Sequence, residues 1–248
     1  MRAMGIKVKR FNKAGELYWL LGVLFISLGV CLCKKADLGV SMIAAPAFII
    51  YDAIKELVPF FTVGVVEYIV QAFFVALLCV VVFKVKVKYL LSILVGVIYG
   101  YVLDMWLLIF KDVYINEVWA RYLMLIVGDA VTAIGVACFF RTYLPIQSYD
   151  IFVKDVALRY NLNINKFKLI YDFSLLTVSV VLAFSLFGDV KTFDWTQIYK
   201  MSYHNLGLGT LITTIINSPF IFVAGKLLDK LLGQEPIFIK AKAFLDRG

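Results

Sequence analysis

Six long apolar stretches set the main limit on what this chain can fold into. A helix that crosses a lipid bilayer needs roughly 20 apolar residues. Stretches of that length lie at about 15–33, 61–83, 89–110, 119–140, 167–187 and 205–225. We therefore predict an all-α integral membrane protein with six transmembrane helices.

The composition excludes the main soluble classes. Of the 248 residues, 62% are hydrophobic and 17% are charged, whereas a soluble domain has about 45–50% apolar and about 25% charged residues. A soluble globule of this size would lack the charged residues needed to cover its surface. The net charge of +8 would favour nucleic acid in a soluble protein. In this chain the positions of Lys and Arg relative to the apolar stretches explain the positive charge as a signal of membrane orientation, so no nucleic-acid partner is expected.

The distribution of Lys and Arg predicts the orientation. A basic N-terminus precedes a long apolar run without a small-residue cleavage site, which indicates an uncleaved first helix. With six alternating helices, 18 of the 25 Lys and Arg residues fall on the side of both termini and seven on the other side. Cytoplasmic loops carry the excess of Lys and Arg. We therefore expect both termini in the cytoplasm and the chain in a bacterial cytoplasmic (inner) membrane.

Two shorter apolar pieces, 40–57 and 147–161, are expected to be interfacial or re-entrant helices that lie in, or dip into, one membrane face. The second carries charges at helical spacing, so we expect it to be amphipathic and interfacial. The first residues of these helices would be Ser41, Gln147 and Ser148, and Ser41 and Ser148 could cap them. Helix N-termini aimed at a cavity could instead hold an anion or a carboxylate. Ordinary capping at the interface is the alternative.

The two halves of the chain resemble each other. A shift of 106 residues aligns two pairs of glycines, Gly22 with Gly128 and Gly29 with Gly135. Three spans per half is an odd number, so the second half must be inverted, which is typical of secondary transporters and some channels. We predict one transmembrane domain over 1–230, with repeats at about 15–112 and 119–230, and a cytoplasmic amphipathic tail at 231–248. Chance alignment of apolar sequence is the alternative.

Three short motifs point to a known family. They are Leu38-Gly-Val-Ser41 after a first helix that ends in Lys-Lys-Ala-Asp, the helix with Gly96 and Asp104, and the last helix with Gly207-Leu-Gly-Thr210 and Asn217-Ser-Pro219. Over most of residues 15–230 the chain resembles the YczE/YyaS/YitT family of bacterial multi-pass membrane proteins. The resemblance implies this topology and a transporter-like protein. The family is uncharacterised, so the resemblance implies no specific activity.

Four acidic residues interrupt the apolar runs. A charged side chain at mid-membrane costs at least ~2.5–3.5 kcal/mol, so it is a functional candidate by default. The acids are Glu67, Asp104, Asp129 and Asp172, and their main neutral companions are Gln71 and Asn217. We expect these side chains to line a central cavity, with Asp129 and Asn217 nearest its midpoint. The alternatives are that Glu67 and Asp172 are solvated near the interface, or that Glu67 pairs with Arg121.

These features predict a secondary-transporter-like protein that moves a small solute by alternating access, with proton coupling through Asp104 or Asp129 as an added option. The alternatives are a passive channel, and a non-transport assembly factor or substrate-binding subunit of a larger complex. The expected partners are the lipid bilayer and a small-molecule or ion substrate, with a second copy of the chain or another membrane protein as further options. The sequence contains no nucleophile–base set, phosphate loop or metal-ligand spacing. We therefore expect no enzymatic activity, no cofactor and no metal site.

Overall fold

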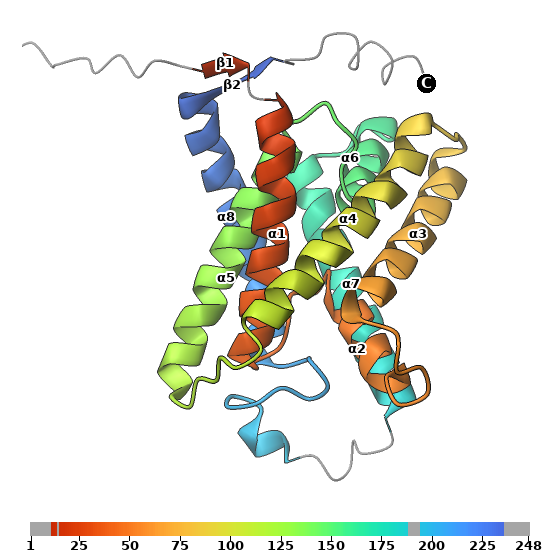
Figure 1. The fold of residues 1–248 in the computed structure, drawn as a ribbon. Coiled ribbons are helices and arrows are strands. Elements are labelled where there is room, and N and C mark those ends of the chain that lie inside the picture. The colour runs from red at the N-terminus through yellow and green to blue at the C-terminus, as the bar shows by residue number, and fades with distance from the viewer. Residues whose placement is uncertain (1–10, 14, 188–193, 236–248) are drawn as a thin grey trace, which may run out of the picture.

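The computed structural model describes residues 11–13, 15–187 and 194–235, and most of them are helical (Figure 1). The long helices are α1 (Gly15–Ala36), α3 (Val63–Val82), α4 (Val87–Ile109), α5 (Val118–Phe139), α7 (Ile164–Leu186) and α8 (Leu208–Leu231). All six are long and apolar enough to cross a membrane. The predicted fold class is therefore confirmed. The predicted boundaries agree to within three residues, except that α8 continues to Leu231, six residues past the predicted end at 225.

Four shorter elements complete the described chain. Two are the short helices that were expected, α2 (Ala45–Ile54) and α6 (Ser148–Arg159), and a 3-10 helix, η2 (Trp195–Gln197), precedes α8. The strands β1 (Phe11–Lys13) and β2 (Leu232–Glu235) pair in parallel, so the first and last described segments lie together. Most of the predicted tail at 231–248 lies outside the described residues.

The chain direction alternates from one long helix to the next (Figure 1). Both ends of the described chain therefore lie on one side of the bundle, which we call the termini face. The loops after α4 and α7 lie on the other side, the opposite face. Helix α2 lies toward the opposite face and α6 toward the termini face, and neither short helix crosses the bundle.

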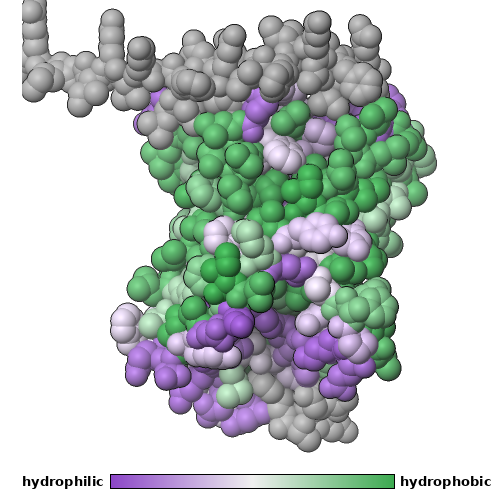
Figure 2. Space-filling view, in the orientation of Figure 1, coloured by the Kyte–Doolittle hydropathy of each residue, from purple (hydrophilic) through white to green (hydrophobic). Residues whose placement is uncertain are grey.

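The outer surface has the character that a bilayer requires. Large apolar side chains cover the outside of the helices, and examples are Val80, Tyr101, Leu108 and Ile170. Figure 2 shows this broad apolar surface and a concentration of hydrophilic residues at the opposite face. Because lipid tails cover such a surface at no cost, the exposed apolar residues support a multi-span membrane protein.

Helices α1 and α5 cross at the centre of the bundle, and glycines set how closely they approach. A Cβ atom added at Gly29 would lie 2.1 Å from Thr132 Oγ1 and 2.4 Å from the Gly128 carbonyl oxygen. A Cβ at Gly135 would meet Ile26 and the Gly22 carbonyl. Small residues at such a crossing allow the van der Waals contact that holds membrane helices together.

We expect the Gly29→Ala variant to lose about 1–3 kcal/mol of stability, because the added methyl group overpacks the crossing. Thermal unfolding of the purified protein in detergent measures this loss. The matched control is Leu20→Phe, which adds volume to the same helix at a side chain that is 50% exposed. Equal unfolding temperatures for the two variants would show that the crossing relaxes to accept the methyl group.

Candidate functional site

A small enclosed cavity lies in the middle of the bundle, and we call it the central cavity. Its volume of about 20 Å³ is close to the space that one water molecule needs. The cavity is bounded by α1, α3, α4, α5, α6, α8 and the segment before α2. The lining residues are Ile26, Val30, Ser41, Met42, Ile43, Ala44, Glu67, Tyr99, Thr132, Val136, Gln147, Asp150 and Asn217.

The two short helices begin at this cavity. The residue before α2 is Ala44, and the residue before α6 is Gln147; neither makes a side-chain capping bond. The prediction that Ser41 and Ser148 cap these helices by their hydroxyl groups is therefore wrong. The Ser41 carbonyl instead accepts the N–H groups of Ala44 and Ala45 at 3.0 and 2.9 Å. The Ser148 N–H donates to Gln71 Oε1 at 3.3 Å.

Several polar atoms at the cavity are buried without a hydrogen-bond partner among the described residues. Three of them belong to lining residues: Glu67 Oε2, Gln147 Nε2 and Asn217 Oδ1. These three side chains belong to residues that are at most 3% exposed. Since buried polar groups are normally paired, unpaired groups around one cavity are what a site for a small polar ligand, water or proton requires.

A cluster of buried charges adjoins the cavity. Lys168 and Asp172 form an ion pair at 3.1 Å, with side chains that are 4% and 0% exposed. Asp129 accepts a 2.9 Å hydrogen bond from Asn217 Nδ2, and both Asp129 and Asp150 interact electrostatically with Lys168 and Asp172. Three buried aspartates thus interact with one buried lysine, and Asp150 also interacts with Lys154. We call Asp129, Asp150, Asp172 and Lys168 the aspartate–lysine cluster.

The structure brings most of the predicted site residues together. Ser41, Glu67, Gln147 and Asn217 line the central cavity. Gln71, Asp129 and Asp172 were expected to line it and do not. Gln71 instead accepts a hydrogen bond from the Ser148 N–H, and Asp129 and Asp172 belong to the aspartate–lysine cluster. The alternative that Glu67 and Asp172 are solvated is wrong, because the two residues are 1% and 0% exposed.

Asp104 and Arg121 lie elsewhere. Asp104 Oδ1 accepts the Gly64 N–H at 3.0 Å, so the carboxylate binds the first turn of α3. Arg121 pairs with Asp37 at 2.8 Å and donates to the Ala36 carbonyl at 2.7 Å. The alternative pairing of Arg121 with Glu67 is therefore wrong.

Asp150 and Lys168 were not among the predicted site residues, although the structure places both in the cluster. The charges of 147–161 predicted an interfacial helix, but the first half of α6 is buried, and α6 packs against α3, α4 and α7. Only its second half reaches the termini face, where Asp155 pairs with Lys86 at 3.3 Å. Lys168 lies at the start of the apolar stretch predicted at 167–187, and its position four residues before Asp172 is the spacing of a helical ion pair.

Asp150 gives the site a pH dependence that can be measured. Burial raises the pKa of the Asp150 carboxyl from 3.8 to about 6; Lys168 and Lys154 act to lower it and Asp172 to raise it. Between these two values the unfolded chain releases the proton that the folded chain keeps. The wild type therefore loses stability as the pH rises through this window.

The Asp150→Asn variant should be free of this loss. Its free energy of unfolding, relative to wild type, should rise by about 2 kcal/mol between roughly pH 4 and pH 7. Denaturant unfolding in detergent at both pH values measures the difference, and titrating groups that do not interact with Asp150 cancel in the comparison. A difference that is the same at both pH values would show that Asp150 does not keep its proton on folding.

Comparison with known proteins gives a family but no activity. The sequence model with the description "Family of unknown function (DUF6198)" matches residues 13–226. The chain is also 25% identical over 147 residues to "Uncharacterized protein YyaS" of Bacillus subtilis (strain 168), an alignment that covers 58% of this chain and 70% of that protein. No solved structure matches the chain. The two sequence matches confirm the resemblance that the three short motifs indicated.

Proposed function

We propose that this chain, which belongs to the family of unknown function DUF6198, is a secondary transporter that moves a small solute by proton-coupled alternating access. The observation that carries the proposal is the central cavity with its unpaired polar atoms and the adjoining aspartate–lysine cluster. We place the protein in a bacterial cytoplasmic membrane with its termini face in the cytoplasm. The excess of Lys and Arg on that side supports this orientation.

The depth and enclosure of the site favour transport. Ionisable side chains inside a membrane bundle are costly and usually mark a solute, ion or proton pathway. A site in the middle of the bundle, beside the starts of two short helices, is typical of secondary transporters. An open channel would instead need a continuous wet pore, whereas the central cavity is enclosed and has room for about one water molecule.

The packing pattern supports two inverted halves. Helix α1 packs on α4 as α5 packs on α8, and α2 packs on α3 as α6 packs on α7. Across the halves, α3 packs on α6 as α7 packs on α2. Two inverted repeats at about 15–112 and 119–230 would produce this pattern, and rocking one against the other would expose the central cavity to each face in turn.

The charge balance supports proton coupling. Three aspartates and one lysine of the cluster, together with Glu67, leave more acids than bases in the bundle interior. Uncompensated carboxylates are expensive there. Binding of one or more protons, or of a cation, would offset the excess.

Solute-driven proton flux tests the proposal. Purified protein is placed in liposomes that contain a pH-sensitive dye, and amino acids, carboxylates and inorganic ions are added in turn. We expect one solute class to drive saturable proton movement in the wild type, and Asp129→Asn to reduce it at least ~100-fold, the scale of a lost catalytic proton-transfer group. The control, Asp112→Asn, changes an exposed acid of the opposite face and should keep the flux.

Three results would contradict transport. If no solute of the panel drives proton flux, the proposal of proton-coupled transport loses its support. Unsaturable ion conduction that survives Asp129→Asn would favour the passive channel. A membrane protein that co-purifies at fixed ratio, without any flux, would favour an assembly factor or a subunit of a larger complex.

A further inference from the structure

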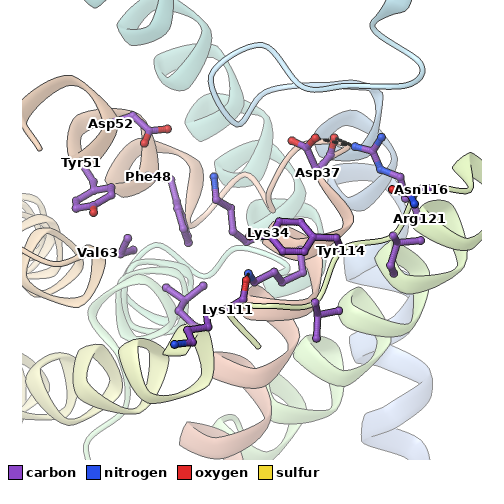
Figure 3. Close-up of a pocket in the computed structure, with 14 residues that line it drawn as sticks. Lys34, Asp37, Phe48, Tyr51, Asp52, Val63, Lys111, Tyr114, Asn116 and Arg121 are labelled. Atoms are coloured by element: carbon purple, nitrogen blue, oxygen red, sulfur yellow. Dashed lines mark hydrogen bonds and ion pairs between the residues drawn. The ribbon is translucent and has the colours of Figure 1, made fainter. Parts of the chain in front are cut away.

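A second and larger pocket opens at the opposite face, between α1, α2, the end of α4 and the loop that follows it (Figure 3). Its volume of about 500 Å³ lies in the range of small-molecule sites, about 300–1,000 Å³. We call it the opposite-face pocket. Four cations and two acids line it: Lys34, Lys35, Lys111, Arg121, Asp37 and Asp52.

The two acids of this pocket form their ion pairs with cations other than its three lysines. Asp37 is paired with Arg121 at 2.8 Å. Asp52 accepts a 2.6 Å hydrogen bond from Asn205 and pairs at 3.1 Å with Lys55, which is not a lining residue. Both carboxylates therefore already have a cationic partner other than the three lysines of the pocket.

The three lysines of the pocket form no ion pair among the described residues. Lys34 donates to the Asn205 side-chain oxygen, and Lys35 donates to the Lys111 carbonyl at 2.9 Å; these acceptors are neutral. The Lys111 ammonium forms no ion pair within the part of the chain that the structure describes. None of the three ammonium groups forms an ion pair among the described residues, although Lys34 interacts electrostatically with Asp52 and Asp37. The four cations of the pocket outnumber its two acids, which favours an anionic ligand.

Aromatic rings give the same pocket an apolar wall. Phe48, Tyr51 and Tyr114 line it beside the lysines (Figure 3). The Lys34 ammonium lies 5.3 Å from the Phe48 ring centre, and the Lys35 ammonium 5.8 Å from that of Tyr114. Apolar walls with a few charged groups suit an organic molecule better than a bare inorganic ion.

The opposite-face pocket lies one helical turn from the central cavity. Three elements contribute to both, each through two residues spaced by four. In each pair the first residue lines the central cavity and the second lines the opposite-face pocket. The pairs are Val30 and Lys34 on α1, Ala44 and Phe48 at α2, and Glu67 and Val63 on α3. In all three elements the second residue is nearer the opposite face. A layer of about 5 Å, one turn of helix, separates the two spaces.

The cations gather here against the general trend of the chain. Only seven of its 25 Lys and Arg residues belong to the opposite-face segments, and four of these seven line this one pocket. The orientation of membrane proteins depends on keeping Lys and Arg away from the non-cytoplasmic side. A cluster of cations that works against this trend calls for a reason other than topology.

We propose that the opposite-face pocket binds a small organic carboxylate, and that this carboxylate is the solute that passes to the central cavity. The second half of this statement rests on the proposed function. Passage beside three buried aspartates is unfavourable for an anion unless protons accompany it, so a carboxylate fits the proton coupling already proposed. The headgroup of an anionic lipid has related chemistry, and the experiment separates the two sources.

Calorimetric titration of the full chain in a neutral detergent tests the pocket. The probes are acetate, benzoate and citrate, with phosphatidylglycerol in mixed micelles as the lipid and benzylamine as a cation of similar size to benzoate. We expect saturable binding of at least one carboxylate and none of benzylamine. Lys35→Gln with Lys111→Gln should weaken carboxylate binding by about tenfold or more, because two nearby cations are lost. The control is Lys166→Gln, an exposed lysine at the start of α7, and it should bind as wild type does.

Other outcomes would overturn the proposal. Binding of phosphatidylglycerol alone would make the pocket a lipid-headgroup site. Equal binding of benzylamine, or carboxylate binding that the two lysine changes leave intact, would remove the role of the cations. If no carboxylate probe binds, the pocket is also rejected as a carboxylate site.

The two proposals can fail separately, because titration in detergent does not require transport. Carboxylate binding in detergent without carboxylate-driven flux in liposomes would keep the pocket as a binding site and reject the proposed transport. Flux driven by another solute class, without carboxylate binding, would reject the pocket and keep the transporter.

Discussion

The Lys168→Met variant should lose about 3–5 kcal/mol of stability. In the wild type, the Lys168 ammonium is the 3.1 Å partner of Asp172, whose side chain is fully buried. Removal of the lysine leaves an acid inside the bundle beside two further aspartates, Asp129 and Asp150. Thermal and denaturant unfolding in detergent measure the loss.

The control for this prediction is Lys166→Met. It removes the same charge two residues away, at an exposed position of the same helix, and should unfold close to wild type. Equal stability of the Lys168→Met and Lys166→Met proteins would mean that Asp172 needs no cation in the folded state. The ion pair would then not hold the cluster together.

Replacement of both partners should separate stability from function. The double variant Lys168→Met with Asp172→Leu removes the buried pair and fills its space with apolar atoms, which is often neutral or stabilising. We expect it to recover most of the stability that Lys168→Met loses. Solute-driven proton flux should nevertheless fall at least ~100-fold, because the cluster loses a proton-binding acid and its only lysine.

Flux in liposomes, normalised to folded protein, measures the effect of the double change. Wild-type flux in this variant would show that Lys168 and Asp172 only stabilise the bundle. The coupling would then belong to Glu67, Asp129 or Asp150. Loss of flux together with loss of folding would be seen in the unfolding curve, so the two causes can be told apart.

The six spans were predictable because each is set by a local property, the length of an apolar run. The alternating direction and the common face of both termini follow from an even number of such runs. Asp129 and Asn217 were predicted nearest the midpoint of the cavity from their depth in their helices; Asn217 lines the central cavity, whereas Asp129 does not line it and accepts a 2.9 Å hydrogen bond from Asn217. Depth along the helix thus indicated the position of Asn217 at the cavity, but not the contacts of Asp129.

The neighbours of a side chain across helices were not predictable in the same way. Asp104 lies inside an apolar run, as Asp129 does, but the approach of Gly64 turns it toward the start of α3. The segment 147–161 has charges throughout, and only the packing of α6 on α3, α4 and α7 determines that Asp150 is buried and Asp155 reaches the termini face. The opposite-face pocket joins residues from five separate segments, so no local pattern indicated it.

Accessibility of the central cavity from the two membrane faces is the most direct test of the account. The four native cysteines are free and are first replaced by Ala or Ser. Ser41→Cys then places a thiol of similar size at the cavity wall, and Ser179→Cys is the control on α7, at a fully buried residue that does not line the cavity. A membrane-impermeant thiol reagent is applied to one side of oriented liposomes at a time.

Alternating access predicts that the Ser41→Cys protein reacts from either face. Reversal of the pH gradient should speed the reaction from one face as it slows the reaction from the other, and the Ser179→Cys protein should stay unreacted. Reaction of Ser41→Cys from neither face would contradict the account, because the buried polar site would then be a fixed part of the scaffold.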